Sequence, residues 1–213
     1  PMTGMMPYDT IQIQLIDTPP ISAETFESYL PNLIRGADLV LLVCDLAEPE
    51  TFISSLELLI DRLREKRIEL IADDSQKGDD ARFVYKRTVI CGHKEYEDTE
   101  GIARARLIER FPSYRFVGTS ILDDDSIADL KKAMFESLEI IRVYTKQVGK
   151  PGDKRDPVIL PIGGTVEEAA EVIHKDFAKD LKFAKLWGTG KFDGQRVTRD
   201  HILADEDTVE FHI

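Results

Sequence analysis

A carboxylate that follows a predicted strand is the first residue with a recognisable chemistry. The run IQIQLI at residues 11–16 alternates apolar with polar side chains, which predicts a strand with one face on a core. Asp17 follows at once, and Thr18, Pro19 and Pro20 form a turn. Nucleotide-binding α/β domains place a carboxylate at such a strand end, near a metal-bound phosphate. The alternative is that Asp17 is a plain turn residue before two prolines.

A second set of residues combines positive charge with aromatic rings. Lysines interleaved with rings could contact the phosphates and stack on the bases of an RNA partner. The alternative is that the rings belong to a core and the lysines to its solvated rim, and for the rings we favour the core. The lysines are Lys175, Lys179, Lys182 and Lys185, and the rings are Phe177, Phe183 and Trp187.

Composition limits the partners of the chain. Its 213 residues carry a net charge of −12 with a pI near 4.8, which argues against general binding to nucleic acid or an anionic membrane but allows a local basic face. No apolar run is long enough to span a membrane, and no signal peptide is visible. Cys44 and Cys91 lie in apolar runs and are expected to be buried thiols in a reducing, cytoplasmic compartment. Because the chain starts at Pro1 in mid-pattern, we expect a fragment.

The elements that must position these residues alternate between strands and helices. The apolar run DLVLLVCD at residues 38–45 predicts a strand covered on both faces. Strand alternating with helix predicts a doubly wound parallel sheet. The further strands are expected at 68–71, 87–92 and 115–118, the helices at 49–63, 99–111 and 126–141 with a short one within 22–35, and residues 2–8 are expected to pair with 11–16 through a turn at Asp9 and Thr10.

A smaller second domain is predicted from residue 140 onward. Strands are expected at 141–146, 158–160, 183–187, 196–197 and 208–213, with a helix at 165–174 that Thr165 and Glu168 cap. This order predicts a β-grasp module. From Glu139 on, 12 Lys and Arg face 14 Asp and Glu, so most of the acidity belongs to the first domain.

Several motifs resemble those of one family of GTPases. DTPP at 17–20, GHKEYED at 92–98 and VGTS at 117–120 resemble the later nucleotide motifs of translation-factor-related GTPases. IIRVYTK at 140–146, DPVILP at 156–161, IHKDF at 173–177, AKLWG at 184–188 and DEDTVEF at 205–211 resemble the TGS domain of the developmentally regulated GTP-binding proteins, in the Obg-like group. The resemblance implies an α/β fold: a partial P-loop GTPase-like sheet over 1–139, lacking its first strand and phosphate loop, and a β-grasp TGS domain over 140–213.

The resemblance also implies roles for particular residues. Asp17 would hold Mg²⁺ within a switch II segment made of Asp17, Thr18, Pro19 and Pro20. Lys94 would pack along a guanine. The nucleotide-binding residues implied are His93, Lys94, Thr119, Ser120 and Ile121, the last three through backbone N–H groups on the base edge.

Three departures from the family pattern weaken those roles. No G-x-x-x-x-G-K-[ST] occurs in the chain, so a phosphate loop is missing and this chain alone is expected to bind GTP poorly and to be inactive. Pro20 replaces a glycine whose N–H would meet the γ-phosphate. His93 and Tyr96 replace the Asn and Asp of N-K-x-D, so Glu95, Glu97 or Asp98 would have to supply a substitute carboxylate.

Two functions from different classes remain. The first is a GTP-binding, Mg²⁺-dependent regulatory protein, a slow or degenerate GTPase in its full-length form, whose TGS domain contacts the ribosome, another RNA or a protein, with no membrane partner. The second is a nucleotide-independent interaction module in which the G-domain remnant is only a scaffold. Exposed strand edges at the missing strand also predict a homodimer.

Overall fold

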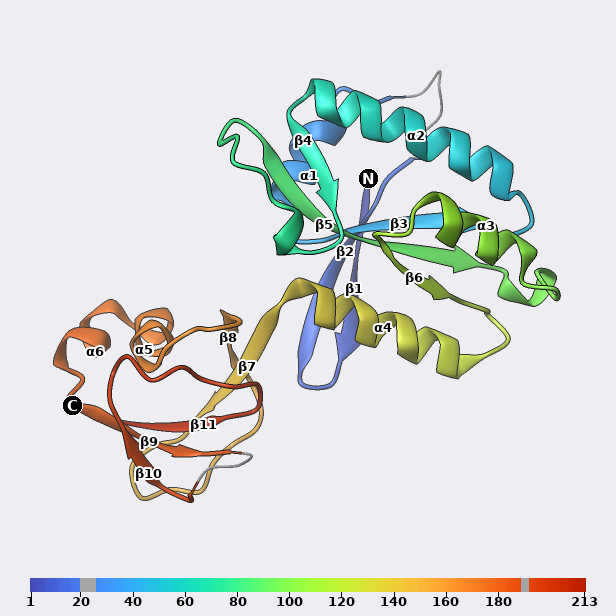
Figure 1. Cartoon of the computed structure of the whole chain (residues 1–213). Coiled ribbons are helices and arrows are strands. Elements are labelled where there is room, and N and C mark those ends of the chain that lie inside the picture. Colours follow the sequence, from blue (N-terminus) through green and yellow to red (C-terminus); the bar gives the residue numbers. More distant parts are fainter. Residues whose placement is uncertain (20–25, 189–191) are drawn as a thin grey trace. The chain divides into compact units, whose positions relative to one another are not determined.

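The structure, a computed structural model, describes residues 1–19, 26–188 and 192–213 (Figure 1). Residue contacts divide the chain into two units. The first comprises Pro1–Met2 and Ile16–Leu138, and the second comprises Thr3–Leu15 and Glu139–Ile213. The predicted boundary, between 139 and 140, lies one residue beyond the division at 138 and 139, and residues 3–15 group with the second unit. Within the described ranges, no helix has both the length and the apolar character that a membrane crossing requires.

The first unit is built on a parallel sheet in which three strands pair with one long strand. β5 (Val84–His93) pairs in parallel with β3 (Val40–Asp45), β4 (Ile68–Ile71) and β6 (Arg115–Gly118). Residues 88–92 of β5 are all buried, as the apolar sequence predicts. The predicted parallel sheet is confirmed.

Over residues 1–19 and 26–138, four α-helices accompany this sheet. Figure 1 shows α2 and α4 on opposite sides of it, as in a doubly wound domain. Leu56, Leu59 and Leu63 form the buried face of α2. The helices are α1 (Leu30–Gly36), α2 (Pro49–Glu65), α3 (Ile102–Arg110) and α4 (Asp124–Leu138).

One face of β3 is less covered than its sequence predicts. Leu42 and Cys44 are 8% and 1% exposed, but Val43 between them is 57% exposed. In the described part of the chain β3 pairs only with β5, so its other edge has no neighbouring strand. The prediction of a strand covered on both faces is therefore wrong for the face that carries Val43.

The strand before Asp17 does not join the parallel sheet. β1 (Met2–Tyr8) and β2 (Ile11–Asp17) form a separate two-stranded sheet. Their predicted pairing through a turn at Asp9 and Thr10 is confirmed. The alternation of β2 is only partly matched by burial: Ile11 and Ile13 are half-buried, but Leu15 is 36% exposed.

A buried arginine fixes the turn of this hairpin within the second unit. The side chain of Arg142 is 6% exposed, and its guanidinium pairs with the carboxylates of Asp9, Asp205 and Glu206. The hydroxyl groups of Thr10 and Tyr144 lie 2.8 Å apart. The turn of the hairpin is thus fixed by charge and by hydrogen bonding to β7 (Ile140–Thr145).

The second unit is a mixed sheet with two helices. The strand order is β10-β9-β11-β7-β8, with β11 parallel to β7 and the other pairs antiparallel. Figure 1 shows α5 and α6 together on one side of this sheet. The predicted β-grasp module is confirmed. Its remaining elements are β8 (Val158–Pro161), α5 (Val166–Ile173), α6 (Lys175–Asp180), β9 (Phe183–Trp187), β10 (Gln195–Val197) and β11 (Thr208–His212).

The start of α5 follows the predicted capping box. The Oγ1 of Thr165 accepts a hydrogen bond from the backbone N–H of Glu168 at 3.3 Å, and the Glu168 carboxylate accepts one from the Thr165 N–H at 2.7 Å. α6 was not predicted. It begins after His174, whose Nδ1 accepts a hydrogen bond from the N–H of Asp176 at 3.2 Å.

Both cysteine thiols are enclosed by the first unit. Cys44 and Cys91 are 1% and 3% exposed, so the predicted burial is confirmed. Burial, followed by the nearby charges of Cys91 and Asp45, raises the pKa of the Cys44 thiol to about 12. Burial also raises the pKa of Cys91.

These thiols are expected to be inert in the folded protein. Because the thiolate is the reactive form, raised pKa values and burial suppress reaction together. Native protein at about pH 8 should release almost no chromophore from Ellman's reagent, whereas both thiols should react promptly in guanidinium chloride. Rapid reaction of either thiol in the native protein would contradict this placement.

Candidate functional site

The predicted nucleotide-binding residues come together at one edge of the parallel sheet. Since β3, β5 and β6 run in the same direction, their carboxyl ends lie side by side, with Asp45 opposite His93 and Gly92 opposite Gly118. His93 is the last residue of β5, Lys94 follows it, and residues 119–121 follow β6 directly. Ligands of open α/β sheets bind beyond this edge.

Lys94 is held in place by a carboxylate that was not among the predicted site residues. Its ammonium lies 2.5 Å from Oδ2 of Asp45, and His93 Nε2 lies 3.7 Å from the same oxygen. The hydrogen bond from Lys94 lowers the pKa of Asp45, and the same bond raises the pKa of Lys94. Lys94 has a left-handed backbone, with φ of 60°. The sequence contained a signal for Asp45, because it ends an apolar strand just as Asp17 does.

Glu95 ties the two loops of this edge together. Its backbone N–H donates to the carbonyl of Thr119 at 3.0 Å. Its carboxylate receives the Arg104 guanidinium at 2.8 Å and lies against Gly118, where an added Cβ would come within 2.1 Å of it. A side chain at 118 would displace this carboxylate.

Two of the three candidate substitute carboxylates are therefore engaged within the protein. Glu95 is paired with Arg104, and Asp98 accepts the backbone N–H groups of Ala103 at 3.0 Å and Arg104 at 2.9 Å, at the start of α3. Glu97 is exposed, and Tyr96, in the position of the family's base-specifying Asp, is 43% exposed.

The loop after β6 presents little of its own polar surface. Thr119 and Ser120 are 4% and 8% exposed. Their N–H groups donate to the carbonyl of Gly92 at 2.7 Å and to Ser126 Oγ at 3.0 Å. Of the three predicted N–H contacts to a base edge, this leaves the N–H of Ile121, whose residue is 86% exposed.

The predicted metal ligand lies at the end of β2. Asp17 and Pro19 are exposed and Thr18 is half-buried, whereas Pro20 lies outside the described residues. Among the described residues, no group of three or more His, Cys, Asp or Glu side chains could hold a metal ion. Mg²⁺ in nucleotide sites is held by one or two carboxylates together with phosphate oxygens. Asp17 therefore fits such an ion only when a nucleotide supplies the other ligands, and its metal role stays a prediction.

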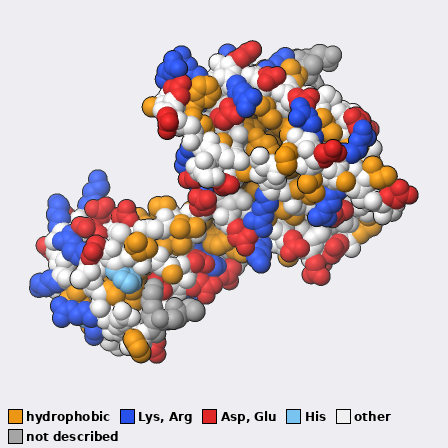
Figure 2. Space-filling model, in the orientation of Figure 1, with side chains coloured by type: hydrophobic (Ala, Val, Ile, Leu, Met, Phe, Trp, Pro, Cys, Tyr) orange, Lys and Arg blue, Asp and Glu red, His pale blue; other side chains and the backbone are white. Residues whose placement is uncertain are grey.

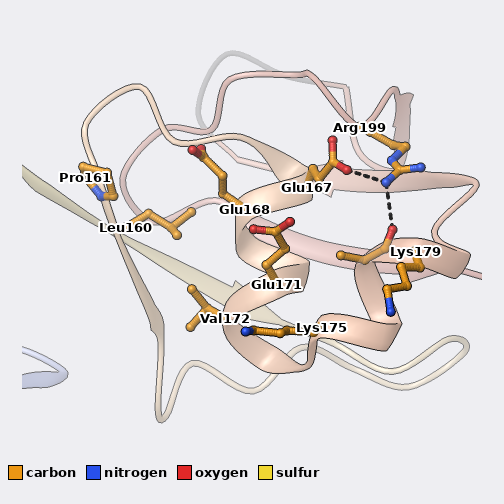
Figure 3. A pocket seen from close by; sticks show the side chains of 10 residues that line it. Leu160, Pro161, Glu167, Glu168, Glu171, Val172, Lys175, Lys179 and Arg199 are labelled. Atoms are coloured by element: carbon orange, nitrogen blue, oxygen red, sulfur yellow. Dashed lines mark hydrogen bonds and ion pairs between the residues drawn. The ribbon is translucent and has the colours of Figure 1, made fainter.

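The four predicted RNA-contacting lysines lie on different elements of the second unit, and Figure 2 shows several Lys and Arg side chains (blue) on the visible face of this unit. Lys175 and Lys179 belong to α6 and line a cavity of about 590 Å³, shown in Figure 3, whereas Lys185 lies on β9 and Lys182 immediately before it. Glu167, one of three glutamates that also line the cavity, pairs with Arg199. The lining is mixed in charge and comprises Leu160, Pro161, Glu167, Glu168, Glu171, Val172, Lys175, Ala178, Lys179 and Arg199.

The aromatic residues of this region divide in the same way. Phe177 packs edge-to-face on the buried Phe211, with ring centroids 5.6 Å apart, so its predicted place in the core is confirmed. Phe183 and Trp187 are half-buried on β9, where the intervening Ala184 and Leu186 are the residues that enter the core. Their expected core role is therefore wrong, because the strand turns them to the opposite face.

Comparison with known proteins identifies the second unit. Residues 141–213 match the TGS domain family. Developmentally-regulated GTP-binding protein 1 of Xenopus laevis is 38% identical over 84 residues, which are 38% of this chain and 23% of that protein. Developmentally-regulated G-protein 3 of Arabidopsis thaliana is 31% identical over 146 residues, or 68% of this chain and 38% of that protein. The chain spans between a fifth and two fifths of the length of such relatives.

One solved structure shares the fold across most of the chain. The YchF GTPase of Schizosaccharomyces pombe superposes with a TM-score of 0.59, covering 87% of this chain and 75% of that one at 12% identity. The expected resemblance is confirmed at this level: a GTPase-like α/β unit is followed by a TGS domain.

Replacing Lys94 by Met should change the titration of Asp45. Loss of the hydrogen bond is expected to raise the Asp45 pKa toward its ordinary value. A carboxyl whose pKa is lowered by folding stabilises the fold above its unfolded pKa of about 3.9, and that stabilisation disappears as the pH falls through the folded pKa. Lys94→Met should therefore be less stable than wild type near neutral pH, and the difference should vanish in acid.

Carboxyl ¹³C NMR titration and urea unfolding at several pH values measure these two effects. Lys66→Met, which removes an exposed lysine at the end of α2, is the matched control and should change neither. An unchanged Asp45 titration in Lys94→Met would contradict the pairing.

Proposed function

We propose that this protein, with a TGS domain at residues 141–213 and a GTPase-like parallel sheet before it, is a GTP-binding regulatory protein that contacts RNA or the ribosome through its TGS domain. One observation carries the nucleotide part of this proposal. Residues at the ends of two neighbouring strands, His93 and Lys94 at the end of β5 and residues 119–121 after β6, lie at the carboxyl edge where such sheets bind ligands. Relatives of the chain are named GTP-binding proteins.

The base half of the site is the better supported half. Lys94 would pack its aliphatic stem along the purine while Asp45 holds its ammonium. The N–H of Ile121 would meet the base edge. Glu95 would keep the two loops together, as its bonds to Thr119 and Arg104 already do. Because Glu95 and Asp98 are engaged and Tyr96 replaces the specifying carboxylate, discrimination between guanine and adenine is expected to be weak.

The phosphate half depends on groups beyond the base site. GTP would supply the phosphate oxygens that complete a Mg²⁺ site, and Asp17 would be the protein's ligand to that ion. No Gly-rich phosphate loop occurs in these 213 residues, so this chain alone should bind nucleotide weakly and hydrolyse it slowly or not at all. A cytoplasmic location agrees with two buried, free thiols.

A second candidate function is favoured by the same departures. In a nucleotide-independent interaction module, the first unit would act only as a scaffold. The engaged Glu95 and Asp98, and a β2 strand outside the parallel sheet, favour this alternative.

Binding of mant-GTP and mant-ATP separates the two functions. The measurement compares this chain with a version extended by the genomic sequence upstream of Pro1. We expect the extended protein to bind mant-GTP with a Kd below about 100 μM and the 213-residue chain to bind at least tenfold more weakly.

Matched lysine variants test the site itself. Lys94→Ala should weaken binding by about fivefold or more through lost packing on the base, whereas Lys66→Ala should leave it unchanged. Failure of the extended protein to bind either nucleotide would exclude the GTP-binding function in favour of the scaffold.

A further inference from the structure

The TGS sheet has one face that its helices do not cover. Ala184 and Leu186 on β9 are fully buried in the core beneath α5 and α6. Successive side chains of a strand point to opposite faces, so the residues between them point away from the helices. On β10 and β11, the residues paired with outward residues of β9 share this face. We call it the outer sheet face and define it by Phe183, Lys185, Trp187, Arg196, Glu210 and His212.

The register of three strands places these residues side by side on the sheet. Lys185 on β9 lies between Arg196 on β10 and Glu210 on β11. Phe183 lies opposite His212 in the next row. Trp187 lies opposite Thr208 on β11. The face therefore combines charged, aromatic and hydroxyl side chains.

Each aromatic ring of the outer sheet face is covered by a cationic or ring group. The Phe183 and His212 rings stack with centroids 4.4 Å apart and an interplanar angle of 9°. The Arg196 guanidinium lies 3.9 Å from the Phe183 centroid. The ammonium of Lys146, at the end of β7, lies 4.3 Å from the Trp187 ring. Flat groups stacked in this way offer further planar surfaces to a ligand.

Glu210, the one carboxylate among these six residues, is neutralised by Lys146. The Glu210 side chain is 5% exposed, and it pairs with the 13%-exposed Lys146 and, at 2.8 Å, with His212 Nε2. The hydrogen bond from Lys146 lowers the pKa of Glu210, so Glu210 is ionised at neutral pH. The ammonium of Lys185 lies 3.9 Å from the same carboxylate, but its side chain is 41% exposed, so Lys185 and the exposed Arg196 present their positive charges to solvent. A local positive surface thus exists on a chain of net charge −12.

We propose that the outer sheet face binds single-stranded RNA, with Lys185 and Arg196 on its phosphates and a base stacked over Trp187 or the Arg196–Phe183–His212 stack. The inference rests on the proposed RNA contact of the TGS domain and assigns it to this face. Single-stranded RNA fits because planar groups and cations alternate here, which suits bases and phosphates, whereas an apolar protein surface would need aliphatic partners. The α6 lysines are the less suitable site, since three glutamates share their cavity.

The single tryptophan makes this face directly observable. Trp187 is the only Trp of the chain, so intrinsic indole fluorescence reports on the outer sheet face alone. Titration of the full 213-residue protein with an oligouridylate of about 12 nucleotides should quench this fluorescence saturably, and the apparent affinity should fall steeply with added salt. Anisotropy of the same RNA, labelled with fluorescein, measures binding independently of Trp187.

Charge-matched double variants locate the site. Lys185→Glu with Arg196→Glu should weaken RNA binding at least tenfold and reduce the salt slope by about 1.4, since each phosphate contact contributes about 0.7 on single strands. Lys175→Glu with Lys179→Glu, the same charge change on α6, should change affinity less than twofold. Because charge reversal beside Glu210 could disturb folding, the neutral pair Lys185→Gln with Arg196→Gln serves as a second test and should weaken binding at least fivefold. Circular dichroism verifies the fold of each variant.

Four results would overturn the assignment. They are no RNA binding by either signal, RNA binding by anisotropy without a change in Trp187 fluorescence, an equal or larger loss in the α6 variant, or equal quenching by a polyglutamate of the same length. A loss confined to the α6 variant would leave the proposed RNA contact standing and remove only its placement here. Nucleotide binding is scored separately with mant-GTP, so its failure does not affect this result.

Discussion

The parallel alignment of strands around β5 is the constraint on which the candidate site depends. Because β3 and β6 pair in parallel with the buried half of β5, the residues that follow all three strands meet at one edge. Residues 88–92 of β5 are all buried, so this part of the strand lies inside the core of the sheet. Asp45 then fixes Lys94, and Glu95 fixes the loop that begins at Thr119. The site therefore follows from backbone pairing and two local polar contacts.

Local patterns in the sequence were sufficient to predict most elements. The bounds of β6 and β9, the inner face of α2 and the capping box of α5 all depend on residues close together in the chain. The exposure of Val43 and the separation of β2 from the parallel sheet could not be predicted this way. Both depend on which distant segments pair with a strand or pack over its faces, and these are tertiary contacts. Arg142, which joins Asp9 to Asp205, is a contact of the same distant kind.

The candidate sites show the same division between local and distant information. His93, Lys94 and residues 119–121 were predicted together and do share an edge, but the engagement of Glu95 with Arg104 depends on α3 and was not predicted. The outer sheet face could have been predicted from the sequence. In FAKLW at 183–187 the small or aliphatic residues Ala184 and Leu186 alternate with Phe183, Lys185 and Trp187, so one face of that strand combines rings with a charge.

The central proposal is that the carboxyl edge of the parallel sheet binds the base of a purine nucleotide such as GTP. The most direct measurement is a ¹H–¹⁵N NMR titration of the chain with GTP at millimolar concentrations, where even weak binding is visible. We expect progressive amide shifts confined to the loops at 93–98 and 118–122 and to Asp45, with the second unit unaffected. No shifts at these amides, or shifts concentrated in another part of the chain, would contradict it.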